Sequence, residues 1–250
     1  MPDDLCGQSG QHRLRRGAID TLSLVPAHTA RPGGRLGSLV YGQLKEKLLD
    51  GHYMAGDRVA VEELKAEFGV SKQPVMDALR RLNSDGLVEI LPQIGCRIPV
   101  YGRRETADYF NTFASFEGVV AAIAATRWVG DQVDELSALN TRIRNDDATS
   151  PGERTHRYRV GNRQFHSLIH TMADSRVIAD VSRRMFDLAD LLINTAGRPF
   201  PLADAVPARA DDHDAICAAL QQRDAEGARA AMELHIRSTA TLIFPPEPVA

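Results

Sequence analysis

Hydrophobic residues recur at two different spacings along the chain, and the spacing predicts which segments form helices and which form strands. Between residues 36 and 86 they fall every three or four positions, the spacing of one face of a helix. Three helices are predicted there, over residues 36–49, 61–67 and 71–83. From residue 87 the spacing shortens to alternate positions, which predicts strands at 87–91 and 96–100 around a turn at 92–95. Three short helices followed by a β-hairpin are the outline of a winged helix-turn-helix domain.

Local signals at the helix ends agree with this outline. Gly51 follows the first helix, and Gly86 closes the turn after the third. Ser71 is a suitable N-cap for the third helix, because its hydroxyl oxygen can accept from a free amide of the first turn. Pro74 lies within that first turn, where its missing N–H costs little.

Beyond Tyr101 the alternating pattern stops and helical spacing continues almost to the last residue. Six helices are predicted, over residues 104–129, 131–146, 152–173, 175–195, 207–222 and 224–243. Helices of this length suit a single antiparallel bundle. The fold is therefore predicted as mainly α, with an N-terminal winged helix-turn-helix followed by an all-α bundle.

The segments between and beyond these elements complete the domain organisation. Residues 1–35 lack helical spacing and contain Pro32 next to two glycines, so we expect a flexible N-terminal arm. A winged domain at 36–100, a linker at 101–104 and a bundle at 105–243 follow, and residues 244–250 form a tail.

Composition and charge narrow the classes of function. The 250 residues are 43% hydrophobic and 25% charged, which is typical of globular proteins. No run of 18 apolar residues is present, so we expect no membrane span. The three cysteines are scattered and the N-terminus lacks the pattern of a secretory signal, which favours a cytoplasmic protein. The net charge of −3 excludes nucleic-acid binding through bulk positive charge, so any contact with DNA requires a local basic surface.

The predicted winged domain resembles the GntR family of bacterial transcription regulators. The resemblance covers residues 36–100 and is densest from Val61 to Leu82 and in Asp85-Gly86-Leu87-Val88. Its fixed landmarks are Gly56-Asp57-Arg58, Gly69-Val70-Ser71 and Gly95. This resemblance implies a DNA-binding domain whose third helix is the recognition helix and whose wing turns at Gly95.

The recognition helix would present its N-terminal residues to base edges in the major groove. That end carries Ser71, Lys72 and Gln73, a cation and two hydrogen-bonding side chains. Lys72 suits guanine or phosphate, and Gln73 suits adenine or the DNA backbone.

Three further residues are expected to contact DNA, and one position departs from the GntR pattern. Arg58 and Arg80 are expected to hold phosphates, and Gly95 would let the wing approach the minor groove. Many relatives have a second arginine on the recognition helix where this chain has Met76. The loss of that cation predicts a different operator preference.

Three histidines and one asparagine of the bundle form the second candidate site. Asn162 and His166 stand four residues apart, so one helix places both side chains on one face. His213 and His235 lie on the last two predicted helices. Taken alone, three histidines on helices are more often core or surface residues than metal ligands.

The surroundings of these residues resemble the FCD effector domain, which defines the FadR-like branch of the GntR family. The similar segments are Asn162-Arg163-Gln164-Phe165-His166, Asp212-His213-Asp214-Ala215-Ile216 and Ala228 to His235. In many members an Asp and three His bind one divalent metal, and a small organic acid binds beside it. The resemblance thus implies a metal held by His166, His213 and His235, with Asn162 at the Asp position. Three neutral imidazoles suit zinc or nickel.

The same resemblance implies an effector pocket near Phe113, Glu117 and His170. Many relatives have an arginine at the position of Phe113, so one carboxylate clamp is absent and the pocket is more apolar. Because Asn162 is uncharged, the site would keep the full charge of a divalent metal and attract an anion. His170 is either a spare ligand or part of the pocket wall.

Three functions follow from these features. The first is a homodimeric transcription regulator, a repressor in most of this family, that binds operator DNA and senses a small anionic effector. The second is a metal-dependent hydrolase that uses the three histidines, although HExxH and Gly-x-Ser-x-Gly motifs are absent from the sequence. The third is a structural nucleoprotein, which the net negative charge disfavours.

Overall fold

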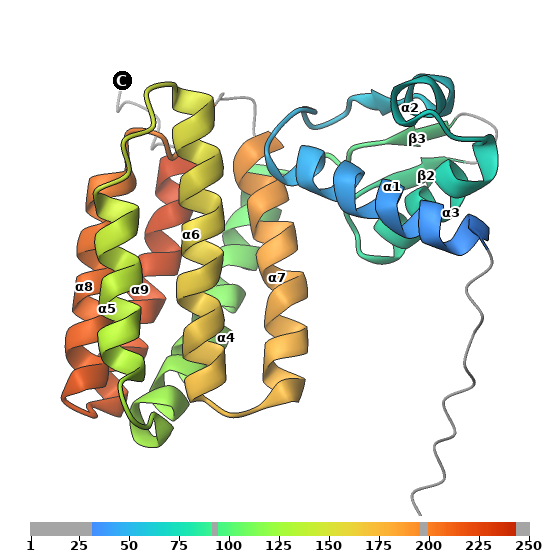
Figure 1. Ribbon diagram of the computed structural model, residues 1–250. Helices are drawn as coiled ribbons and strands as arrows, with labels where there is room; N and C mark the ends of the chain where they lie inside the picture. Colours follow the sequence, from blue (N-terminus) through green and yellow to red (C-terminus); the bar gives the residue numbers. More distant parts are fainter. Residues whose placement is uncertain (1–31, 92–94, 196–199, 244–250) are drawn as a thin grey trace, which may run out of the picture.

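The computed structural model describes residues 32–91, 95–195 and 200–243, which form a small α/β domain and a helical bundle. Figure 1 shows the bundle on one side and the smaller domain beside its helix α7. Within the described residues, no helix is long and apolar enough to cross a membrane. The predicted fold class is confirmed.

The small domain is a winged helix-turn-helix. Its helices are α1 (Pro32–Leu49), α2 (Val61–Phe68) and α3 (Lys72–Ser84), and its strands are β1 (Arg58–Val59), β2 (Glu89–Leu91) and β3 (Gly95–Arg97). Strand β3 lies in the centre of the antiparallel sheet, in the order β1-β3-β2. Leu44 of α1, Leu79 of α3 and Leu87, which precedes β2, are fully buried in a common core.

Glycines with positive φ end or join several of these elements. Gly69 adopts the left-handed conformation after α2, with φ 62°, and its amide donates to the carbonyl of Lys65. Gly95 opens β3 with φ 126°, a conformation that L side chains rarely adopt. Of the predicted wing turn 92–95, residues 92–94 lie outside the described residues.

The elements differ from the sequence predictions at several places. Helix α1 begins at Pro32, within the arm predicted for 1–35, because the fixed φ of proline already matches a first helical turn; residues 1–31 are outside the described part. Helix α4 begins at Arg103, within the predicted linker 101–104, where the carboxylate of Glu105 accepts from the amide of Gly102 and caps the helix. Strand β1 was not predicted, since two residues carry no periodicity.

The bundle contains six of the described helices, each within two residues of its predicted bounds. They are α4 (Arg103–Arg127), α5 (Gln132–Arg144), α6 (Pro151–Met172), α7 (Arg176–Thr195), α8 (Val206–Gln221) and α9 (Ala225–Ile243). Phe110, Phe165 and Met232 from three of these helices are buried in one apolar core. The predicted tail, 244–250, lies outside the described residues.

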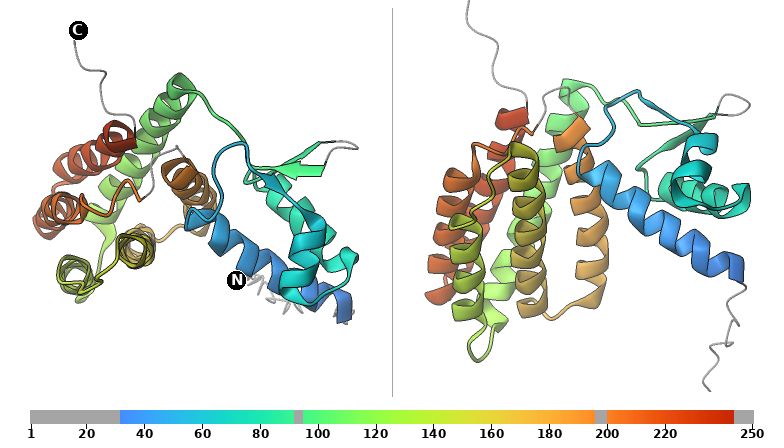
Figure 2. Two further views of the ribbon diagram at one scale, coloured as in Figure 1. Left: turned by 90° about the horizontal axis from the view of Figure 1, so that it is seen from above. Right: turned by 45° about the horizontal axis from the view of Figure 1, so that its top comes forward.

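The C-terminal end of α7 joins the two domains. Leu191 is buried in the core of the winged domain. The side-chain amide of Asn194 donates to the backbone carbonyl of Leu49 at 2.7 Å. Gly51, with φ 76°, passes so close to Asn194 that a Cβ atom there would lie 3.1 Å from that residue. Both views of Figure 2 show this end of α1 beside α7. A displacement of the bundle near Asn194 would therefore act directly on the C-terminal end of α1.

Candidate metal centre and nucleic-acid interface

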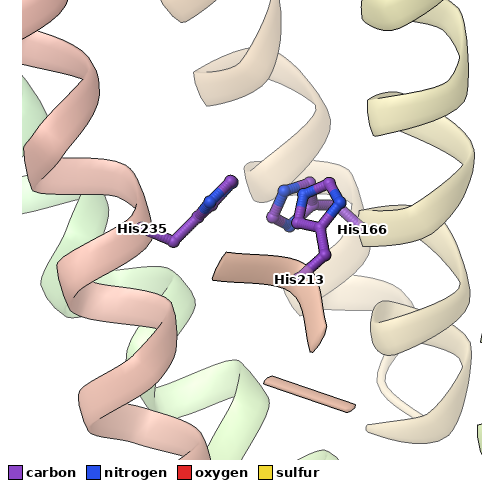
Figure 3. A group of neighbouring side chains, drawn as sticks. All are labelled: His166, His213 and His235. Carbon is purple, nitrogen blue, oxygen red and sulfur yellow. The ribbon is translucent and has the colours of Figure 1, made fainter. Parts of the chain in front are cut away.

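Three histidines from three different helices meet inside the bundle. His166 lies on α6, His213 on α8 and His235 on α9, and one ring nitrogen of each lies within 4.8 Å of the others. Their exposed fractions are 1%, 0% and 3%, respectively. Figure 3 shows the three side chains pointing toward one another. The structure thus brings together the three histidines singled out from the sequence.

Neighbouring side chains fix which nitrogen of two of these rings carries the proton. The amide nitrogen of Asn140 donates to the carbonyl of Ala210 at 2.9 Å and to Asp214 at 2.6 Å. Its oxygen therefore faces Nδ1 of His213, at 3.1 Å, and that Nδ1 is the donor. Nδ1 of His235 lies 3.3 Å from a carboxylate oxygen of Asp212 and donates to it. Both rings consequently carry their lone pair on Nε2, and a hydrogen bond from the second nitrogen is typical of metal-ligating histidines.

His166 differs from the other two histidines because neither of its ring nitrogens has a hydrogen-bond partner among the described residues. A buried polar atom left unsatisfied costs about 1–3 kcal/mol. A cation among the three rings would satisfy one of these nitrogens. The donor set therefore fits a divalent transition metal.

Asn162 lies at the edge of the cluster. Its Oδ1 is 3.1 Å from Nε2 of His213, and the hydroxyl of Tyr158 is 3.3 Å from the same oxygen. Because His213 carries its proton on Nδ1, two acceptors face each other here. Two ligands that share one ion, each about 2.1 Å from it, lie about 3.0–3.4 Å apart. The separation is therefore suitable for a fourth ligand or for a neighbour of the metal.

Burial keeps these imidazoles neutral. It lowers the pKa of His166 and of His213 well below the usual value of 6.5, and nearby positive charge acts in the same direction. Burial also lowers the pKa of His235, although the hydrogen bond to Asp212 opposes that shift. Neutral rings are the form that binds a metal, so the site is prepared for one at pH 7.

A cavity of about 40 Å³ adjoins His166 and His235. Phe113 and Phe186 line its apolar part, and Arg159 and Asp190 bring charge to it. Of the three residues expected in the effector pocket, Phe113 thus lies in this lining.

The other two expected pocket residues lie outside the lining. Nε2 of His170 is 2.9 Å from a carboxylate oxygen of Glu117, and Ser182 donates to the same carboxylate. These three side chains are buried and satisfy one another. Sequence reasoning missed Arg159, which lines the cavity, and Asn140, which contacts His213, because no motif connects their positions. Asp212 stands in a segment that resembles the FCD domain, but its contact with His235 was not predicted.

The predicted DNA-binding residues gather at the start of α3 and on the sheet. Ser71, Lys72 and Gln73 are exposed. Asp77 accepts hydrogen bonds from Gln73 at 2.8 Å and from Arg80 at 2.9 Å, so it holds two of the expected DNA contacts on one helix face.

The remaining members of this face lie nearer the wing. Arg58 is exposed on β1, where it pairs in register with Arg97 of β3. Lys72, Met76 and Gly95 line a groove between α3 and the wing strands. The structure therefore places two of the predicted contacts, Lys72 and Gly95, beside one groove.

Comparison with known proteins identifies both domains. Residues 36–98 match the model of the bacterial regulatory proteins of the gntR family, and residues 108–238 match the FCD domain. The chain belongs to the GntR family. Its FCD domain is consistent with the FadR-like branch of that family.

Several regulators resemble this GntR-family chain along most of their length. The HTH-type transcriptional repressor GlaR of Escherichia coli is 22% identical, over 81% of this chain and 93% of its own. The Exu regulon transcriptional regulator of E. coli is 25% identical, over 84% and 85%. Among solved structures, E. coli McbR/YncC shares the fold, with a TM-score of 0.70 and 19% identity over 84% of this chain and 97% of that one.

These matches establish the general class of the protein. It is a DNA-binding transcriptional regulator of the GntR type with an FCD domain. The family and the named relatives are regulators rather than enzymes, so the hydrolase interpretation of the histidines is not supported.

Proposed function

We propose that this regulator is a metal-dependent repressor whose bundle senses a small anionic metabolite. His166, His213 and His235 would hold one divalent transition metal, with Asn162 as the fourth contact. The observation that carries this proposal is that both ring nitrogens of His166 lack a partner among the described residues, although the ring is buried beside the imidazoles of His213 and His235.

The charge of the donor set favours an anionic effector. Three neutral imidazoles and an amide leave the full double charge of the metal uncompensated within the set. Imidazole ligands favour zinc or nickel over magnesium, which prefers oxygen. The metal would supply an electrophilic centre for a carboxylate, and the adjacent cavity of about 40 Å³ would supply walls for a small ligand.

The repressor role and the homodimer rest on other grounds. A relative over 81% of this chain is named a transcriptional repressor. One winged domain with eight basic and nine acidic residues between 36 and 100 offers few phosphate contacts by itself. Two such domains would bind half-sites about one helical turn apart. Light scattering should therefore show a dimer in solution, and a monomer both free and on operator DNA would contradict this.

The metal part of the proposal is tested by metal content and affinity. Protein purified without chelator should contain about one equivalent of a transition metal by mass spectrometry. His166→Ala should remove it, whereas the control His156→Ala should retain it, because that exposed histidine bonds to Asp50 outside the cluster. Wild-type protein that stays metal-free after incubation with zinc and with nickel would refute the proposal.

The regulatory part is tested by transcription from the chain's own operator. Operator fragments selected from genomic DNA by the purified protein should be repressed when the regulator is added in vitro. Activation, or the absence of any selected sequence, would contradict the repressor role.

A further inference from the structure

Arg159 on α6 connects the cavity to the DNA-binding domain. The residue lines the cavity beside His166, and its exposed fraction is 7%. Its Nε donates to Asp50 at 2.8 Å, and its Nη2 donates to Glu46 at 2.5 Å. Both acids belong to the C-terminal end of α1 or the residue after it. A cation of the cavity is therefore held by two acids of the other domain.

Arg159 also lies at the boundary of the cavity. Together with Phe186 it lines an open groove of about 740 Å³, which is bounded by α1 and by bundle helices. The inner cavity is far smaller, about 40 Å³. Arg159 and Phe186 therefore border both the open groove and the inner cavity that adjoins the histidines.

Two residues near Arg159 also contact the end of α1 and the residues that follow it. Asn194 lines the same cavity and donates to the carbonyl of Leu49, one residue before Asp50. The amide of Ala55 donates to the carbonyl of Thr195 at 3.3 Å. The end of α1 thus rests on the bundle through Arg159, Asn194 and Thr195, and two of these side chains border the cavity.

We propose that Arg159 is the anion-recognition residue of the cavity, and that a carboxylate effector binds it in exchange for Asp50 and Glu46. This inference rests on the proposed function, because it requires an anionic effector in this cavity. A guanidinium presents its donors as a planar fork that matches one carboxylate.

The exchange links sensing to DNA binding. An effector changes the regulator's state when it binds one arrangement of the domains more tightly than the other. A carboxylate on Arg159 would release that arginine from Asp50 and Glu46. The end of α1 would then keep its contacts with Asn194 and Thr195, and the ion pairs His156–Asp50 and Lys45–Asp187. The winged domain would then reorient relative to the bundle.

The test uses acetate as a carboxylate probe and the zinc-loaded full-length protein, with affinity measured by calorimetry. Asp50→Asn weakens the internal competitor, so acetate affinity should rise roughly tenfold, the lower range for a charge-assisted hydrogen bond. Glu67→Gln is the matched control, because Glu67 bonds to Lys47 within the winged domain. It should leave acetate affinity unchanged.

Replacement of Arg159 should have the opposite effect on acetate affinity. Arg159→Gln should lower acetate affinity by roughly tenfold or more. Arg157→Gln, on the same helix, should have no effect because Arg157 pairs with Glu153 and Asp147. Hydrogen exchange of the amides at 46–55 should accelerate with acetate in the wild type.

The outcomes separate this inference from the proposed function. Unchanged acetate affinity in both Asp50→Asn and Arg159→Gln, with zinc still bound, would overturn the exchange and leave the metal site standing. A wild-type protein that binds no metal would refute the proposed function itself. Asp50→Asn keeps the shape of the side chain. The acetate affinity of this variant therefore tests the exchange even if Arg159→Gln fails to fold.

Discussion

Asn140 offers the sharpest test of the metal centre because it acts through a histidine rather than as a ligand. Its amide nitrogen is held by Ala210 and Asp214, which forces its oxygen onto Nδ1 of His213. Substitution Asn140→Ala removes that acceptor. The ring of His213 then loses the contact that keeps the proton on Nδ1 and the lone pair on Nε2.

The expected magnitude follows from this geometry. Loss of a partner that orients a metal-ligating histidine lowers metal affinity about 10–100-fold, equivalent to about 1.4–2.7 kcal/mol. The buried Nδ1–H of His213 is also left unsatisfied in the metal-free protein. That defect costs about 1–3 kcal/mol of the free energy of unfolding.

Competition between the protein and a zinc indicator measures the first effect, and urea unfolding without metal measures the second. Asn145→Ala is the control, because Asn145 is exposed at the end of the same helix and away from the histidines. Asn140→Ala protein that folds and binds zinc as tightly as wild type would refute the assignment of the His213 proton. The same result would show that the hydrogen bond does not orient the ring.

Three further predictions concern other parts of the molecule. Lys72→Ala should weaken binding to a specific operator by about 1–3 kcal/mol if Lys72 reads a base, whereas equal loss on every sequence with a shallower salt dependence would assign it to phosphate. Asn162→Asp should tighten zinc binding and weaken acetate binding, since it adds a negative charge beside the metal. Weaker zinc binding together with tighter acetate binding in calorimetry would contradict the position of Asn162 beside the metal. Burial lowers the pKa of His166 and His213 below 6.5 in the folded state, so the unfolded state binds protons first as the pH falls. The metal-free protein should therefore lose stability below about pH 6.5 in urea titrations, and a double variant with both histidines replaced by Gln should lose less.

The sequence by itself determined the elements whose cause is local. Helix periodicity and the glycines at positions 69 and 86 located the helices of the winged domain, because backbone conformation at a turn depends on the residue that occupies it. The six bundle helices were predicted within two residues for the same reason. The resemblance to the FCD domain singled out the three histidines of the bundle.

Tertiary structure decided the contacts between residues that are distant along the chain. Strand β1 exists because Arg58 and Val59 pair with β3, about forty residues later, and not because of any local preference. Asn140 reaches His213 across 73 positions, and Arg159 reaches Asp50 across 109. Such partners are set by how whole helices pack, and no spacing rule within one helix encodes them. For that reason the sequence indicated the metal ligands, whereas the proton positions on their rings and the link from the cavity to α1 came from the fold.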